Sequence, residues 1–418
     1  MNKKKVLLIT SELYPNLNSN SAIAYQLAKT LQNEYNIDVT ILGYQRKKVS
    51  KSKKDLPGIK TVELKGYNEY LHITGNYTNK LSRYCQLLCH PRGLRVWLKI
   101  MFTRNYRLMN IYTNAIKRYC RLHPVDCIIP VTAPFFGAYA ALLAGVDAPI
   151  VLYKLDPVFH DMQHGFTNNE SLSEKLQMQK KMSERASRIF VAKSMYDSFV
   201  EKFDVGEKTV ATEFPNVVRQ DLQGIPEELK ESELIHCTFA GKLYDNLREP
   251  GYTVDLFEKL ADKGIVFHIL GRSCKSLDER KLPNNVIYHG NLESDTAMAF
   301  MQHSDILVNI GNSDNRYLPS KILTYISTGR PILNIVRCEN CPTVPYINKY
   351  PYSLNLFETE NLTDETVDSV AKFCIENKGK KTPFDTIENI YYDCTPDYIG
   401  KQLYNAINES INEKNFKG

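Results

Sequence analysis

The chain has 418 residues and a formal net charge of +6, from 53 Lys and Arg against 47 Asp and Glu. This length suffices for two or three domains with cores of their own, and 43% hydrophobic with 24% charged residues excludes a disordered chain. The ten cysteines are scattered, and the apolar run 6–9 is too short for a secretory signal. We therefore expect reduced thiols and a cytoplasmic protein.

Strands and helices alternate in the first half of the chain. The apolar run 6–9 predicts a strand buried on both faces, and the spacing of apolar residues over 21–33 predicts a helix after it. Further strands are expected at 37–42, 127–131, 150–155, 188–192 and 208–214. The uncharged stretch 127–146 is interrupted by Pro130, Pro134 and Gly137, so it predicts a strand and a helix of the core rather than a membrane span.

A second α/β series follows a polar linker that is rich in charge. Strands are expected at 234–240, 265–270, 286–288, 306–309 and 331–335, and helices at 251–261, 294–302 and 319–327. An amphipathic helix over 396–413 closes the chain. The predicted organisation is a first domain over 1–215, a second over 216–395 and a closing helix over 396–418, in an α/β architecture of two Rossmann-like domains.

The strongest motif is a strand–loop–helix unit over 304–333. Its strand ends at Gly311, and its helix is expected to begin near Pro319, because proline suits the first helical turn. The backbone amides of Ser320 and Lys321 would then lie at the helix N-terminus, which attracts phosphate. The plainer interpretation is an ordinary strand–helix–strand unit without a ligand.

A second motif places glycine and cations after a strand. Gly241 ends the strand, and Lys242 and Arg248 follow in the loop, where they could clamp a diphosphate. Two solvated surface cations are the alternative interpretation. Gly271 ends the next strand in the same way, with little specificity of its own.

These segments resemble the donor domain of GT-B glycosyltransferases, specifically the retaining family-four (glycosyl transferases group 1) enzymes of bacterial surface-polysaccharide synthesis. The resemblance covers residues 234–335. In the first domain it is topological. The residues that carry it are Gly241, Lys242, Arg248, Pro319, Ser320, Lys321, Tyr325, Gly329 and Pro331.

The resemblance implies two Rossmann-like domains facing across a cleft, with the C-terminal helix returning towards the first domain. It implies transfer of a sugar, with retention, from a UDP- or GDP-type nucleotide sugar to a hydroxyl of a glycan or lipid-linked acceptor. The nucleotide diphosphate sugar is a co-substrate, and the resemblance implies no metal and no other cofactor. Lys242 and Arg248 would contact the donor phosphates during catalysis.

The remaining site residues follow from the same resemblance. The expected donor-binding residues are Gly241, Gly271, Gly311, Asn312, Leu318, Pro319, Ser320, Lys321 and Thr324. In the first domain, Asp156 would face the site as a catalytic residue, unless it only begins an Asp-Pro turn. The expected acceptor-binding residues are Asn18, Ser19, Asn20 and Ser21, because hydroxyls and amides suit a polyol or a phosphate.

Two positions depart from the family pattern. The family commonly has two glutamates eight residues apart, and these positions align with Arg316 and Thr324. Two alternatives therefore stay open: a nucleotide-sugar epimerase of the same fold, and a catalytically inactive sugar-nucleotide-binding or scaffold protein. A nicotinamide dehydrogenase is disfavoured, because no GxGxxG follows the first strand.

Metal sites are not expected. Cys338 and Cys341 form a lone CxxC without a second pair, and His160 and His164 lack a third ligand.

The segment 80–121 is basic and rich in apolar residues. No Asp or Glu occurs from 70 to 125, and Trp97, the only tryptophan, lies in the middle of the segment. Cations beside Trp, Phe and Leu on a helix suit an anionic membrane surface, whereas the alternative is a solvated face of a core-packing helix. Nucleic acid is not expected, because no recognised binding motif accompanies the cations.

Overall fold

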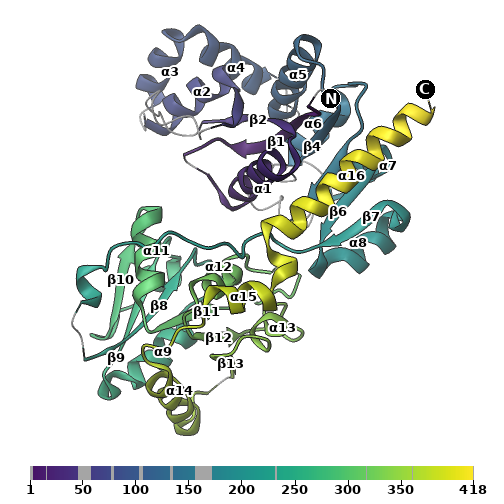
Figure 1. The fold of residues 1–418 in the computed structure, drawn as a ribbon. Helices are drawn as coiled ribbons and strands as arrows, with labels where there is room; N and C mark the ends of the chain where they lie inside the picture. Colours follow the sequence, from purple (N-terminus) through teal and green to yellow (C-terminus); the bar gives the residue numbers. More distant parts are fainter. Residues whose placement is uncertain are drawn as a thin grey trace. The chain divides into compact units, whose positions relative to one another are not determined.

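The computed structural model describes residues 3–15, 17–45, 58–76, 80–102, 107–131, 135–155, 172–230, 233–316, 318–359 and 361–417 (Figure 1). The chain forms two compact units. Unit 1 comprises 1–215 together with 396–418, and unit 2 comprises 216–395. Parallel strands alternate with helices in both units, which confirms the predicted α/β class.

The strands of unit 1 pair in parallel throughout. β1 (Lys5–Glu12), β2 (Asp38–Tyr44), β3 (Lys60–Glu63) and β4 (Cys127–Pro130) form a sheet in the order β3-β2-β1-β4. β5 (Val151–Lys154), β6 (Arg188–Ala192) and β7 (Thr209–Thr212) form a second sheet in chain order, which two single bridges join to β4. Val6 to Ile9 of β1 are fully buried, as expected for a central parallel strand.

Helices pack on both sides of these strands. They are α1 (Ser19–Tyr35), α2 (Lys65–Asn76), α3 (Lys80–Leu88), α4 (Pro91–Phe102), α5 (Arg107–Leu122), α6 (Phe135–Leu143), α7 (Leu172–Arg185), α8 (Tyr196–Phe203) and α16 (Pro396–Lys417). The C-terminal helix α16 packs on α1, where Tyr404 stacks on Tyr35 with 4.5 Å between ring centroids. Arg188 of β6 also pairs with Glu409 and Glu413 of α16.

The basic segment differs from the expectation of one helix. Its described residues form α3, α4 and most of α5, and the chain turns at His90 and Pro91 between α3 and α4. The stretch 127–146 forms β4 and α6, so its prediction as a core strand and helix is confirmed. Among the described residues, no helix has both the length and the apolar character that a membrane span needs.

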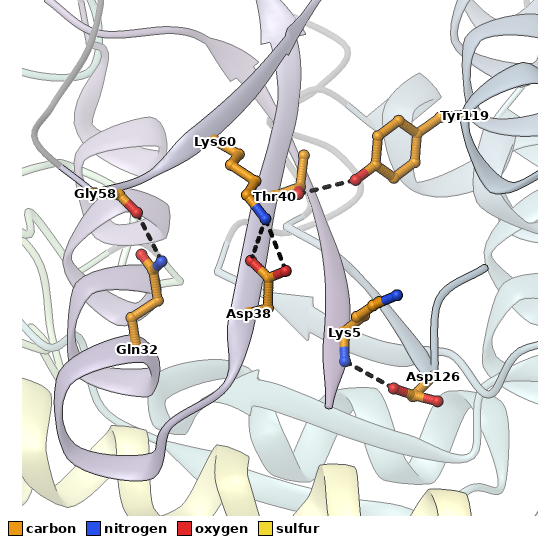
Figure 2. A network of polar contacts seen from close by, with 8 residues as sticks. All are labelled: Lys5, Gln32, Asp38, Thr40, Gly58, Lys60, Tyr119 and Asp126. Carbon is orange, nitrogen blue, oxygen red and sulfur yellow. Dashed lines mark hydrogen bonds and ion pairs between the residues drawn. The ribbon is translucent and has the colours of Figure 1, made fainter. Parts of the chain in front are cut away.

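Polar contacts hold the elements together near the amino ends of the unit 1 strands (Figure 2). Figure 2 shows four pairs: Lys5 N with Asp126 Oδ2 (2.7 Å), Lys60 Nζ with Asp38 Oδ2 (2.8 Å), Tyr119 Oη with Thr40 Oγ1 (2.9 Å) and Gln32 Nε2 with Gly58 O (2.8 Å). These groups bind one another. This edge therefore has a structural role, and a ligand site is expected at the opposite, carboxyl edge of the strands.

Unit 2 contains a six-stranded parallel sheet. Its strands are β8 (Ile235–Ala240), β9 (Ile265–Leu270), β10 (Val286–Gly290), β11 (Ile306–Ile310), β12 (Ile332–Val336) and β13 (Ser353–Phe357), in the order β10-β9-β8-β11-β12-β13. The direction of this order changes at β8, so β8 and β11 flank a topological switch point. In open α/β sheets, ligands bind at the carboxyl ends of the strands at such a point.

The helices of unit 2 are α9 (Gly251–Lys259), α10 (Lys275–Asp278), α11 (Ser294–His303), α12 (Lys321–Thr328), α13 (Val344–Ile347), α14 (Asp364–Asn377) and α15 (Phe384–Ile390). Phe257 of α9 stacks on Phe267 of β9 in the core, with 4.2 Å between ring centroids. α12 begins two residues later than predicted from Pro319. Ser320 is its cap, and Ile322 N bonds back to Pro319 O.

A ladder of three histidines crosses β8, β9 and β10. His236 Nδ1 lies 2.9 Å from His268 Nε2, and His268 Nδ1 lies 2.9 Å from His289 Nε2. Burial, with a further contribution from the neighbouring His236 and His289, lowers the pKa of His268 to about 3. Burial also lowers the pKa of His236 and of His289. The ladder is therefore neutral in the folded protein at pH 7 and strongly resists protonation.

We predict that this ladder makes unit 2 lose stability in acid. An unfolded histidine binds a proton below about pH 6.5, whereas folded His268 stays neutral down to about pH 3, so stability falls as the pH drops through this window. Each such histidine lowers the free energy of unfolding by about 1.4 kcal/mol per pH unit. Urea unfolding between pH 6 and 4.5 should show a shallower pH dependence in His268→Gln than in the wild type. Equal slopes would contradict the prediction, and between pH 7.5 and 8.5 the two slopes should coincide.

Candidate functional site

Glycines end three strands at the carboxyl edge of the unit 2 sheet. Gly241 follows β8, Gly271 follows β9 and Gly311 follows β11. A Cβ on Gly271 would lie 1.9 Å from Gly241 O, and Gly271 has a φ of +117°, so both space and conformation require glycine. A Cβ on Gly311 would lie 2.6 Å from Ile335 O. The backbones therefore crowd together here, and the edge presents main chain rather than side chains.

The loop after β8 is fixed by its own hydrogen bonds and by its neighbours. Tyr244 and Arg248 exchange backbone bonds of 2.9 and 3.1 Å, which closes a tight turn. The Asp245 carboxylate accepts the amides of Lys275 and Ser276, both at 3.0 Å, at the start of α10. Ser313 Oγ donates to Asn246 O at 2.8 Å and ties this turn to the loop after β11. These bonds position Arg248 between two loops.

Arg248 is a partly buried cation at this edge. Its Nε donates to Asn312 Oδ1 at 3.0 Å, and its Nη1 donates to Lys242 O at 3.3 Å. Burial lowers the pKa of Arg248, although Tyr325 and Tyr244 partly oppose that shift. Among the described residues, no carboxylate forms an ion pair with it. A desolvated guanidinium held by neutral acceptors favours a bound anion.

Lys321 is a second partly buried cation, at the first position of α12. Burial lowers the pKa of its ammonium group. Within the ranges that the structure describes, its side chain makes neither a hydrogen bond nor an ion pair. A helix N-terminus adds partial positive charge at the same place. An anion bound beside Lys321 would therefore stabilise its charged form.

Tyr325 holds the start of α12 against the end of β8. Its buried hydroxyl accepts a bond from Ala240 N at 2.7 Å and donates one to Ala240 O at 3.1 Å. Ala240 directly precedes Gly241, so this contact brings Lys321 and the cations of the β8 loop to one edge. Asn216 Nδ2 donates to Ser320 O at 3.4 Å and adds a further tie to the first turn.

The remaining expected donor residues lie on the same elements. Lys242 is exposed directly after Gly241, and Asn312 is buried directly after Gly311. Leu318 and Thr324 are partly buried, before α12 and in its first turn, and Pro319 is buried. The structure thus brings the donor residues expected from the sequence to one edge of unit 2.

Arg316 is held by an acidic neighbour. Its Nε lies 2.9 Å from Asp314 Oδ1 and its Nη2 lies 2.5 Å from Asp314 Oδ2, and this hydrogen bonding lowers the pKa of Asp314. Position 316, where the sequence departs from the family pattern that it resembles, therefore holds an arginine whose charge is largely balanced within its own loop.

The expected acceptor residues in unit 1 lie at the end of β1 and the start of α1. Ser21 is buried: its Oγ lies 3.0 Å from Ser11 Oγ and accepts Glu12 N at 3.0 Å. Asn18 caps α1 by accepting Ser21 N at 2.8 Å, and its Nδ2 donates to Ser11 Oγ at 2.7 Å. Both side chains thus fix β1 to α1. Ser19 is exposed and Asn20 is partly buried.

Several residues at these edges were not expected from the sequence. Asp245 and Ser313 position the cationic loops, and only their place directly beside the glycine–cation motifs could have pointed to them. Lys154 is buried at the end of β5, although it sits in a strand of apolar residues where a lysine is unusual. Asp156, two residues further on, lies outside the described residues, as do His160 and His164.

Metal ligands were also sought in the described part of the chain. It contains no group of three His, Cys, Asp or Glu side chains that could hold a metal ion. Cys338 and Cys341 follow β12, where burial and the neighbouring Cys341 raise the pKa of Cys338 to about 12. A thiol with such a pKa stays protonated at pH 7 and is a weak nucleophile.

No protein-family model and no curated protein matches the sequence. Solved structures do match it over nearly the whole chain. Sucrose-phosphate synthase from Thermosynechococcus elongatus is 11% identical with a TM-score of 0.66, and the match covers 97% of this chain and 99% of that one. A glycosyltransferase from Rickettsia africae is 13% identical with a TM-score of 0.60, covering 98% and 99%.

A further match is a protein from Listeria monocytogenes described as a UDP-N-acetylglucosamine 2-epimerase. It is 12% identical with a TM-score of 0.59, and the match covers 99% of this chain and 98% of that one. At such identities the likeness shows the fold alone. It confirms the expected GT-B architecture of two Rossmann-like domains with parallel sheets.

We predict that Gly271→Ala disrupts the edge of the sheet far more than Gly290→Ala. A methyl group at 271 meets Gly241 O at 1.9 Å, so the loop after β8 must move, whereas a methyl group at 290 meets nothing within 4 Å. Both positions have positive φ, so the matched control carries only the conformational cost of about 1–2 kcal/mol. Thermal unfolding should show a clearly larger loss for Gly271→Ala. Equal losses would mean that the two backbones do not approach each other as described.

Proposed function

We propose that this chain is a glycosyltransferase acting on a nucleotide diphosphate sugar. It transfers a hexose or acetamidohexose, with retention, to a hydroxyl of a glycan or lipid-linked acceptor in surface polysaccharide or glycan biosynthesis. The observation that carries the proposal is the pair of partly desolvated cations, Arg248 and Lys321, at the switch point of the unit 2 sheet. The fold is shared with a glycosyltransferase from Rickettsia africae, which supports the same activity.

The charge at this edge matches a diphosphate. Lys242, Arg248 and Lys321 provide three positive charges, and the N-terminus of α12 adds a partial one. When the bond between the sugar and the diphosphate breaks, negative charge builds on the leaving phosphate oxygens. Cations already held in place stabilise that charge without having to reorganise, which lowers the barrier.

Individual roles follow from the placement of the side chains. Arg248 has donors beyond those bound to Asn312 and Lys242, and these suit two phosphate oxygens. Lys242 is exposed and can move to the phosphate when the donor binds. Thr324 is a candidate hydrogen-bonding partner for a donor hydroxyl, and Gly241, Gly271 and Gly311 let the main chain approach the nucleotide.

In this proposal unit 1 binds the acceptor. Exposed Ser19 and partly buried Asn20 offer polar groups at the start of α1, and Asp156 remains a candidate for orienting the acceptor hydroxyl. No resident metal takes part, because the cations and the helix N-terminus supply the positive charge. We also propose that the enzyme acts in the cytoplasm, peripherally on the inner face of the plasma membrane.

A second candidate is an inactive sugar-nucleotide-binding protein. The pairing of Arg316 with Asp314, and a threonine at 324, leave the donor edge without the two carboxylates that the related enzymes carry. An epimerase of the same fold is the third candidate, supported by the likeness to the Listeria protein. Nucleotide binding is common to all three, whereas net sugar transfer or release of nucleoside diphosphate from a donor belongs to the transferase.

We predict that one nucleoside diphosphate binds saturably and that Lys242→Ala with Arg248→Ala weakens it at least about 100-fold. Charge-assisted hydrogen bonds contribute about 1.5–3 kcal/mol each, so loss of two gives an effect of this size. Isothermal titration calorimetry with UDP, GDP, ADP and CMP measures it. The matched control is Lys281→Ala, which removes an exposed cation from a loop after α10.

The outcomes separate the candidates. If none of the four nucleotides binds the wild type, the proposed donor site is wrong. If one binds and the double variant binds it as tightly, the cations do not form the site. Binding without turnover of any matching nucleotide sugar would favour the inactive protein, whereas interconversion of free nucleotide sugars would favour the epimerase.

A further inference from the structure

Helix α3 directs its apolar residues to solvent. Leu81, Tyr84 and Leu88 recur at intervals of three and four residues on one face, and they are 71%, 45% and 68% exposed. A surface helix of a globular protein normally buries such a stripe against its core. On α3 the buried residue is instead Leu87, which is 1% exposed. The apolar stripe of α3 therefore faces solvent rather than the core of unit 1.

Helix α4 extends this surface. Trp97 of α4 packs edge-on against Tyr84 of α3, with 5.5 Å between ring centroids. Arg92, Arg95 and Leu98 follow one another at intervals of three residues along an exposed face of α4. Figure 1 shows α2, α3 and α4 grouped together within unit 1, and the three helices contact one another. We define the α3–α4 surface as Leu81, Tyr84, Leu88, Arg92, Arg95 and Leu98.

The sequence that contains this surface is strongly basic. No Asp or Glu occurs from 70 to 125, and the segment 80–121 contains ten basic residues: Lys80, Arg83, Arg92, Arg95, Lys99, Arg104, Arg107, Lys117, Arg118 and Arg121. Glu69 of α2 lies 3.7 Å from Arg92 and offsets part of its charge. Arg95 is exposed and pairs with no carboxylate of the described residues. The partner that fits this surface is therefore negatively charged.

We propose that the α3–α4 surface docks on a lipid bilayer that contains anionic phospholipids. The leucines would enter the boundary between headgroups and acyl chains, Tyr84 and Trp97 would lie at the level of the headgroups, and Arg95 would contact lipid phosphates. A second copy of the chain fits less well, because two copies meeting through this face would oppose two basic segments. The proposal deepens the peripheral membrane location proposed above and does not depend on transferase activity.

The single tryptophan gives a direct measurement on the full chain. Trp97 is partly buried beside Tyr84, so its emission should shift to shorter wavelength when the surface enters a bilayer. We expect the shift, and co-sedimentation, with vesicles of phosphatidylglycerol and phosphatidylcholine. Vesicles of phosphatidylcholine alone should give neither, because they lack net negative charge.

Matched variants separate the apolar from the charged contribution. Leu81→Ser with Leu88→Ser should weaken vesicle binding at least tenfold, because two exposed side chains lose their burial in the bilayer. The control, Leu222→Ser with Ile225→Ser, removes two exposed apolar side chains from another part of the chain. Arg95→Gln should weaken binding about fivefold, the effect of one cation at an anionic surface. Its control is Lys181→Gln on α7, which changes the net charge equally.

Three results would overturn the proposal. Unchanged binding by the leucine variant would exclude the surface. A loss in Lys181→Gln equal to that in Arg95→Gln would show unspecific charge attraction. Sedimentation could also show that the wild type is a dimer and that the leucine variant is a monomer with intact vesicle binding. That result would assign the surface to a second copy of the chain. UDP or GDP binding, measured on the same variants, should not change, so a failed donor site and a failed membrane surface are distinguishable.

Discussion

The contact between two backbone segments, at Gly241 and Gly271, is the constraint on which the candidate site depends. Parallel strands deliver their carboxyl ends to one edge, but side chains there would fill the space that a nucleotide needs. The approach of the two glycines removes side chains from the centre of that edge and leaves amides and carbonyls. Lys242, Arg248 and Lys321 lie on the elements next to these glycines. The close approach of Gly241 to Gly271 restricts where the loops can lie.

Electrostatics follows from this packing. Arg248 and Lys321 lose water because the loops and α12 are drawn together, by Ser313 on one side and Tyr325 on the other. The loss of water lowers the pKa of both groups. A bound anion would replace the lost hydration and stabilise both charges. The amino ends of the unit 1 strands differ from this edge of unit 2. There Lys60 and Asp38 form an ion pair, so neither charge needs a ligand (Figure 2). The two kinds of edge differ in whether their charges already have partners.

Much of the fold could be predicted from local sequence patterns. The features that could not be predicted have physical causes. Buried parallel strands such as β6 are continuous apolar runs, so their bounds were predicted correctly at Arg188–Ala192. The segment 80–121 was harder, because its three helices share one composition and only His90 and Pro91 mark the first break. The donor residues could be placed because glycine and cations follow strand ends. The roles of Asp245 and Ser313 depend on contacts between loops far apart in sequence, which local spacing does not encode.

The order of the units along the chain has a consequence for how the molecule can be taken apart. The chain completes most of unit 1, passes through unit 2 and returns to unit 1 as α16. The two ends of unit 2 lie side by side, since Val217 N donates to Cys394 O at 3.0 Å. Unit 2 is thus a continuous insertion with adjacent ends, whereas unit 1 is discontinuous. Excision of residues 216–395 therefore removes one continuous piece, whereas unit 1 on its own needs a linker that rejoins α16 to the rest of the unit.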